Sequence, residues 1–121
     1  MKKKAVVVDD NANNLMLEKD LLEVAGFEVF GAASGADGIA MIRREKPDII
    51  IMDVRLPDMP GTEAIMILRQ DKETSEIPVV FVTASVLEKE RGELVAISNS
   101  GYMSKPISTR TFAKEISQFI K

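Results

Sequence analysis

Residues 47–61 read PDIIIMDVRLPDMPG, so an apolar run ends at Asp53 and a loop with two prolines follows it. The unbroken run from Asp48 to Met52 predicts a β-strand that is covered on both faces, as in a parallel sheet. The prolines and Gly61 predict a stiff loop that leads into a helix over about residues 62–70. This stretch therefore places a carboxylate at the carboxyl end of a buried strand.

The same alternation of strand and helix patterns extends along the rest of the chain. Further strand-length runs lie at Ala5–Val8, Glu28–Ala32, Ile77–Val82 and Ser100–Ser104. Further helical stretches are a first that ends at Gly26, a second from Ser34 to Pro47, a fourth over residues 86–97 and a last that Ser108 caps. Strands that alternate with helices predict an α/β fold, in which helices cover both faces of a parallel sheet.

The helices differ in the patterning of their faces. One half of the first helix carries Leu15, Leu17, Leu21, Leu22, Val24 and Ala25, and the last helix has a stripe of Phe112, Ala113, Ile116, Phe119 and Ile120. Glu18 falls inside the first arc, and nothing in the sequence explains it, whereas Met16 lies outside the arc. The helix over residues 86–97 is polar and contains Gly92, which favours a weakly stable, movable element.

Composition excludes several classes of function. The chain has no His and no Cys, which removes imidazole and thiolate metal sites and the Ser-His-Asp and Cys-His types of catalysis. Its 16 basic and 19 acidic residues give a net charge of −3, so we expect no nucleic-acid partner. The apolar run after Lys2–Lys4 is too short for a signal peptide or a membrane span. We therefore expect one cytoplasmic domain over residues 1–121, with no membrane partner.

Polar side chains follow four of the five predicted strands. Asp9 and Asp10 follow the first strand, Asp53 the third and Thr83 the fourth, and Lys105 comes just after the fifth. Because ligands of open parallel sheets bind beyond the carboxyl ends of the strands, we expect these side chains to meet at one edge. A single aspartate in such a place is commonplace, but three carboxylates with a hydroxyl and a lysine indicate a site.

The chemistry of that group of residues points to a divalent cation and to phosphorus. Crowded carboxylates repel one another, and a hard cation bound through oxygen relieves the repulsion. Without His or Cys, the ligand set suits Mg²⁺, or Mn²⁺ in its place, better than zinc. A carboxylate beside such a cation can act as a nucleophile toward phosphorus. The sequence has neither a GxxxxGK[ST] loop nor a GxGxxG loop after the first strand.

The chain resembles the receiver domain of bacterial two-component response regulators, and most closely the stand-alone receivers that have no output domain. Four motifs carry this resemblance: VVVDDN at 6–11, PDIIIMDVRLPDMPG at 47–61, IPVVFVTA at 77–84 and GYMSKPI at 101–107. The match covers essentially the whole chain. It implies a flavodoxin-like, five-stranded parallel sheet in the order 2-1-3-4-5, with strands numbered along the chain.

The resemblance also implies a phosphoacceptor and its ligands. Asp53 would accept a phosphoryl group from a phosphohistidine on a histidine kinase or a histidine phosphotransfer protein. Asp10 and Asp53 would ligate Mg²⁺ directly, Asp9 mostly through water, and the backbone carbonyl of Arg55 would complete the protein ligands. Such a protein is not an enzyme, apart from its own phosphoryl transfer and autodephosphorylation.

A switch is implied in the same way. Thr83 and Lys105 would hold the phosphoryl oxygens, and Tyr102 would turn inward when Thr83 moves, unless it is simply a half-buried aromatic of an edge strand. The bond between Lys105 and Pro106 would be cis. A downstream protein would bind a surface of the fourth helix, fifth strand and last helix. Asn99 stands near the usual Gly after the fourth helix and can adopt the left-handed conformation.

Other readings remain open at this point. The chain could be a pseudo-receiver that only binds partners, or a receiver cut from a larger regulator. The least favoured alternative is a metal-dependent phosphatase with an aspartate nucleophile. That class needs an acid/base two residues beyond its first Asp, where this chain has Asn11 and Ala12 after Asp10.

Overall fold

The structure is a computed structural model that describes residues 2–83, 97 and 99–120. The elements in chain order are β1 (Lys4–Val8), α1 (Ala12–Val24), β2 (Glu28–Ala32), α2 (Gly35–Glu45), β3 (Ile49–Asp53), α3 (Gly61–Arg69), β4 (Val79–Thr83), β5 (Ser100–Ser104) and α5 (Phe112–Gln118). The helix predicted over residues 86–97 lies outside the described residues, apart from Ile97. No helix among the described residues is long and apolar enough to cross a membrane.

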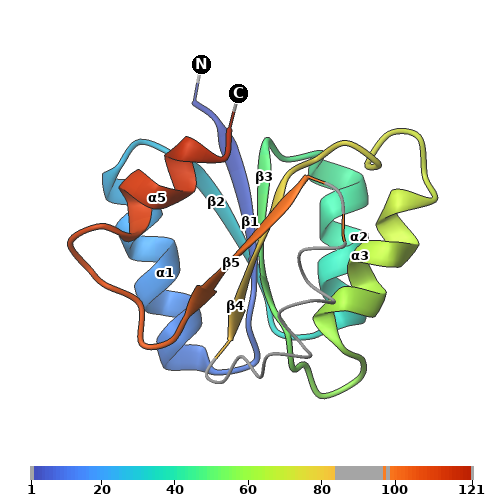
Figure 1. Cartoon of the computed structure of the whole chain (residues 1–121), viewed down its shortest axis with the longest axis horizontal. Coiled ribbons are helices and arrows are strands. Elements are labelled where there is room, and N and C mark those ends of the chain that lie inside the picture. Colours follow the sequence, from blue (N-terminus) through green and yellow to red (C-terminus); the bar gives the residue numbers. More distant parts are fainter. Residues whose placement is uncertain (1, 84–96, 98, 121) are drawn as a thin grey trace.

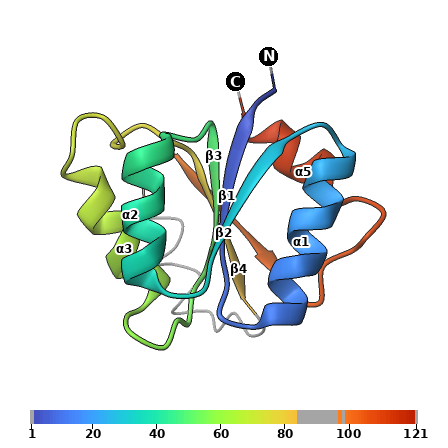
Figure 2. The same ribbon diagram turned by 180° about the vertical axis from the view of Figure 1, so that it is seen from behind.

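The five strands form one parallel sheet in the order β2-β1-β3-β4-β5. Helices α1 and α5 cover one face of this sheet, and α2 and α3 cover the other (Figures 1 and 2). This arrangement confirms the predicted α/β class, the strand order and the helices on both faces. The strands run toward the lower edge of the view in Figure 1, so their carboxyl ends lie side by side there.

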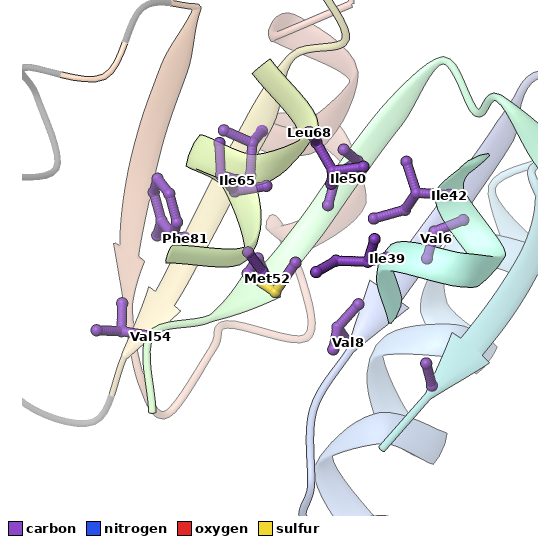
Figure 3. Close-up of a cluster of buried hydrophobic side chains, with 13 residues drawn as sticks. Val6, Val8, Ile39, Ile42, Ile50, Met52, Val54, Ile65, Leu68 and Phe81 are labelled. Atoms are coloured by element: carbon purple, nitrogen blue, oxygen red, sulfur yellow. The ribbon is translucent and has the colours of Figure 1, made fainter. Parts of the chain in front are cut away.

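Burial on both faces explains the unbroken apolar runs of the central strands. Figure 3 shows the cluster between the sheet and α2 and α3, whose labelled members are Val6, Val8, Ile39, Ile42, Ile50, Met52, Val54, Ile65, Leu68 and Phe81. The alternate strand residues pack with Leu22, Phe112 and Ile116 on the opposite face. The central strands β1, β3 and β4 are therefore packed on both faces, and polar groups are left for the strand ends.

Helix α1 corrects one sequence prediction. Within the predicted apolar arc, Leu22 is fully buried, but Leu17 is 39% and Val24 89% exposed. Leu17 and Val24, seven residues apart, share one edge of the arc, whereas the buried pair Glu18 and Leu22, four apart, lies toward its opposite side. The buried stripe is narrower than the arc, so the centre of the helix face that meets the sheet holds a carboxyl group. Met16, as predicted, is exposed.

The helix ends agree with the sequence except at α5. Ser34 caps α2, since its hydroxyl accepts a hydrogen bond from the amide of Asp37, and Gly26 follows α1 with a φ of +102°. Asn99 adopts the left-handed conformation at φ +56°. The expected cap at Ser108 is wrong, because α5 begins only at Phe112 and Thr111 is the residue before it. Ser108 instead contributes its backbone carbonyl, which accepts from the amide of Phe112.

Candidate functional site

Three carboxylates meet at the carboxyl edge of the sheet. Val8 pairs with Met52 in the register of β1 and β3, so Asp9 and Asp53 follow at neighbouring positions. One carboxylate oxygen from each of Asp9, Asp10 and Asp53 lies within 4.8 Å of the others. Asp9 and Asp53 are buried and Asp10 is exposed, so the cluster opens to solvent on one side.

Each of the two buried carboxylates is held by a backbone amide two residues further along the chain. Asp9 Oδ1 accepts from the amide of Asn11 at 2.9 Å, and Asp53 Oδ1 accepts from the amide of Arg55 at 3.1 Å. Aspartate often stabilises the start of a loop in this way. These contacts occupy one oxygen of each side chain, and the Oδ2 oxygens lie on Lys105.

Lys105 joins the two buried carboxylates. Its Nζ donates to Asp9 Oδ2 at 2.9 Å and to Asp53 Oδ2 at 3.1 Å. The backbone amide of Lys105 donates to the carbonyl of Thr83 at 2.7 Å, and the bond between Lys105 and Pro106 is cis. Thr83 is buried at the end of β4. The lysine and the threonine are thus tied together at the same edge as the aspartates.

Tyr102 lies on β5, opposite Phe81 in the register of β4 and β5. It is half-buried and packs against the cluster that β1, β3 and β4 form with α2 and α3. Tyr102 is thus a half-buried aromatic on an edge strand, and β4 separates its strand from β3, which carries Asp53. Its role as a switch stays a prediction.

Burial and the ammonium group of Lys105 determine the pKa shifts in the site. Burial raises the pKa of Asp53, although the Arg55 amide and the Lys105 ammonium oppose the rise. Burial lowers the pKa of Lys105, but its hydrogen bonds to Asp9 and Asp53 outweigh that effect and leave it raised. Without a bound metal ion, the Lys105 ammonium is a positive charge that the described part of the chain places against both buried carboxylates.

Glu18 is a fourth acidic group beside the site, and reasoning from the sequence gave it no role. Glu18 is only 2% exposed. Burial is the largest cause that raises its pKa to about 8, and the charge of Asp9 is the next. The carboxyl group also hydrogen-bonds Asp9. The only signal in the sequence was an acidic residue within the apolar arc of a helix.

The donor set fits a hard divalent cation. Mg²⁺ is typically bound through one or two carboxylates and keeps several waters, and the exposed position of Asp10 leaves room for them. Arg55 lies two residues past Asp53, where a short antiparallel bridge to Pro60 turns the chain back. The arrangement can therefore combine a buried carboxylate nucleophile, a cation and a lysine at one point.

Comparisons with known proteins agree with this geometry. A family model described as the response regulator receiver domain matches residues 5–117. The polar-differentiation response regulator DivK of Brucella ovis is 34% identical over 120 residues, which are 99% of this chain and 98% of that protein.

Solved structures show the same fold. The chemotaxis response regulator CheY4 of Vibrio cholerae has a TM-score of 0.92 at 27% identity, over 99% of this chain and 100% of that one. The receiver domain of the sensor histidine kinase PA1611 of Pseudomonas aeruginosa, solved with a magnesium ion in its active-site cleft, has a TM-score of 0.88 at 24% identity, over 98% of each chain, and supports the fold alone. With the family model and the DivK match, these findings show that the chain belongs to the response regulator receiver domain family.

Proposed function

We propose that this receiver takes a phosphoryl group onto Asp53 from a phosphohistidine of a histidine kinase or a histidine phosphotransfer protein. The observation that carries this proposal is the position of Asp53, which is buried at the end of β3. Its Oδ2 lies 3.1 Å from Lys105 Nζ, and one of its carboxylate oxygens lies within 4.8 Å of oxygens of Asp9 and Asp10. Asp9 is also buried, bound to Lys105 and flanked by two acidic side chains, but its side chain is 2% exposed against 10% for Asp53, so Asp53 is the more accessible of the two to a phosphoryl donor.

Asp9, Asp10 and Asp53 would hold Mg²⁺, with the backbone carbonyl of Arg55 as a further ligand. When bound, Mg²⁺ supplies positive charge beside the oxygens of the incoming phosphoryl group, and Mn²⁺ shares its preference for oxygen ligands. Three carboxylates, one lysine and one divalent cation sum to zero charge. A site with no net charge does not repel the negatively charged phosphoryl group. We therefore expect the cation to bind before the phosphoryl group arrives.

The chain's own residues would supply the nucleophile and its support. An oxygen of Asp53 attacks phosphorus, the bond from phosphorus to the donor imidazole breaks, and an acyl phosphate forms on the aspartate. The amide of Arg55 already occupies Oδ1, which fixes the orientation of the carboxylate. Lys105 and the hydroxyl of Thr83 would then donate to phosphoryl oxygens, where charge-assisted hydrogen bonds are strong.

The phosphoryl group would act as a switch through Thr83, Lys105 and Tyr102. Movement of Thr83 toward the phosphate would be transmitted to Lys105, because the backbone amide of Lys105 donates to the carbonyl of Thr83. Tyr102 lies on β5, the strand that leads directly to Lys105. A surface of β5, α5 and the predicted helix over residues 86–97, which lies outside the described residues apart from Ile97, would then bind a downstream protein in the cytoplasm. Phosphorylation acts in this way by adding charge and acceptors beside a two-state element.

Two alternatives are less well supported. A pseudo-receiver does not need the filled acidic cluster or its lysine. A phosphatase needs a free acid or base beyond its aspartate, but the Asn11 side chain caps α1 by accepting from the amides of Asn13 and Asn14.

Mass spectrometry tests the proposal. We expect one phosphoryl adduct after treatment with acetyl phosphate and Mg²⁺, its loss in Asp53→Asn, and its retention in Asp37→Asn, an exposed aspartate of α2. An adduct that persists in Asp53→Asn would disprove the assignment. Turnover of a free phosphomonoester would favour the phosphatase instead.

A further inference from the structure

The loop after the phosphoacceptor is clamped onto a neighbouring helix. Asp58 lies in the connection between β3 and α3, five residues after Asp53, and its side chain is exposed. Its Oδ1 accepts from the amide of Gly35 at 2.8 Å and its Oδ2 from the amide of Ala36 at 2.9 Å. These amides are the first two of α2 and have no partner within the helix.

Two contacts besides these hydrogen bonds close the same interface. Met59 packs against the core beneath α2 and α3. A Cβ placed on Gly35 would lie 2.5 Å from Met59 Cγ and 3.2 Å from Asp58 Oδ1, so a larger residue there would displace the Met59 side chain. The amides of Ala36 and Gly35 also hold the pKa of Asp58 below its usual range. The clamp thus has a charged half and an apolar half.

The other end of the loop is closed at its base. The amide of Gly61 donates to the carbonyl of Val54 at 2.7 Å, and Arg55 bridges Pro60. Arg55 is therefore part of this closed base, and the Asp58 contact lies three residues further along the same loop. The amide of Arg55 is the donor to Asp53 Oδ1, so any displacement of the loop would move a group that touches the phosphoacceptor.

We propose that Asp58 is a positioning residue for phosphorylation: by binding the start of α2 it fixes the loop that presents Arg55 to Asp53 and to the cation. This inference rests on the proposed function of Asp53. It goes beyond that proposal because it assigns a role to a side chain that touches neither the cation nor the phosphoryl group. It also makes the start of α2 a structural part of the site.

Ser34→Ala is the matched control for this proposal. Ser34 caps the same helix through the amide of Asp37, and among the described residues its hydroxyl forms no hydrogen bond to the loop. Asp58→Ala and Ser34→Ala each remove capping from the start of α2, and only Asp58→Ala also releases the loop. A difference between the two variants therefore reports on positioning, and a loss that they share reports on the stability of the helix.

The experiment measures Mg²⁺ affinity by calorimetry and the rate of phosphorylation by acetyl phosphate, with melting temperatures alongside. We expect Asp58→Ala to weaken Mg²⁺ binding about tenfold, as removal of a group that orients a metal ligand does, and to slow phosphorylation, with Ser34→Ala near wild type. Asp58→Asn, which keeps one acceptor oxygen, should fall between them. Gly35→Ala keeps Asp58 but displaces Met59, so it should also weaken Mg²⁺ binding and slow phosphorylation.

Two results would overturn the inference. Equal Mg²⁺ affinity and phosphorylation rate in Asp58→Ala and Ser34→Ala would reduce Asp58 to a helix cap and leave the function of Asp53 intact. If wild type bound no Mg²⁺ and took no phosphoryl group, the proposed function would fail together with the inference. The wild-type measurement therefore separates the two failures.

Discussion

Replacement of Glu18 by Gln is expected to stabilise this protein, and the gain should depend on pH. The Glu18 carboxyl group is buried beside Asp9, and its pKa is raised to about 8 from an ordinary value of 4.5. Burial is the largest cause, the charges of Asp9 and Asp53 add to it, and the charge of Lys105 opposes it. Gln keeps the shape and a donor toward Asp9 but cannot ionise.

The sign follows from proton linkage. Folded protein holds the Glu18 proton more tightly than unfolded protein, so this group does not reduce stability below about pH 4.5 and costs progressively more as the pH rises toward 8. At about 1.4 kcal/mol per pH unit, wild type should lose about 3 kcal/mol by pH 7 and less than about 1 kcal/mol by pH 5. Glu18→Gln avoids this loss, which corresponds to about 10 °C in melting temperature at pH 7.

The assay is urea denaturation followed by circular dichroism at pH 5, 6, 7 and 8, with a chelator present to remove divalent cations. Glu23→Gln is the control, because Glu23 is an exposed glutamate on the same helix. The gap between Glu18→Gln and wild type should widen with pH, and Glu23→Gln should follow wild type. If the curves of Glu18→Gln and wild type stay parallel from pH 5 to pH 8, the buried carboxyl group is not the cause and the reasoning is refuted.

Three further predictions concern the same edge of the sheet and its support. Lys105→Met should lower the free energy of unfolding at pH 7 by about 3 kcal/mol without Mg²⁺, because it leaves two buried carboxylates unpaired; urea denaturation measures this, and an unchanged midpoint would contradict it. Mg²⁺ at about 100 times its Kd should stabilise wild type by about 3 kcal/mol, and Asp10→Asn should gain less at the same concentration in thermal melts; equal gains would exclude Asp10 as a ligand. Gly101→Ala should cost about 1–3 kcal/mol, since its Cβ would overlap the Phe119 ring, and a wild-type melting temperature would show that α5 can shift freely.

Much of the fold could be predicted because its signals are local. The runs at Glu28–Ala32 and Ser100–Ser104 match β2 and β5 to the residue, and alternation with helices gave the parallel sheet. The start of β4 at Val79, not Ile77, follows from Pro78, whose nitrogen cannot donate to the sheet. Even the convergence of polar groups follows from the rule that strands of a parallel sheet end at one edge.

What the sequence did not predict depends on how helices and loops turn relative to the sheet. A helical wheel limits Glu18 and Val24 to the same broad arc, but only packing against β1 buries one and exposes the other. In the same way, nothing local indicates that Asp58 reaches across to amides more than twenty residues earlier in the chain. Contacts of this kind are set by tertiary geometry, which periodicity does not contain.

The pairing of Val8 with Met52 has a consequence for how such a protein can change. Because the side-chain period of a strand is two, one residue inserted into β3 would turn Asp53 to the opposite face, while insertions in the surface connections would leave it in place. The register of β1 and β3 therefore determines where Asp9 and Asp53 lie relative to each other. Changes of length in the surface connections are compatible with an unchanged position of these two carboxylates.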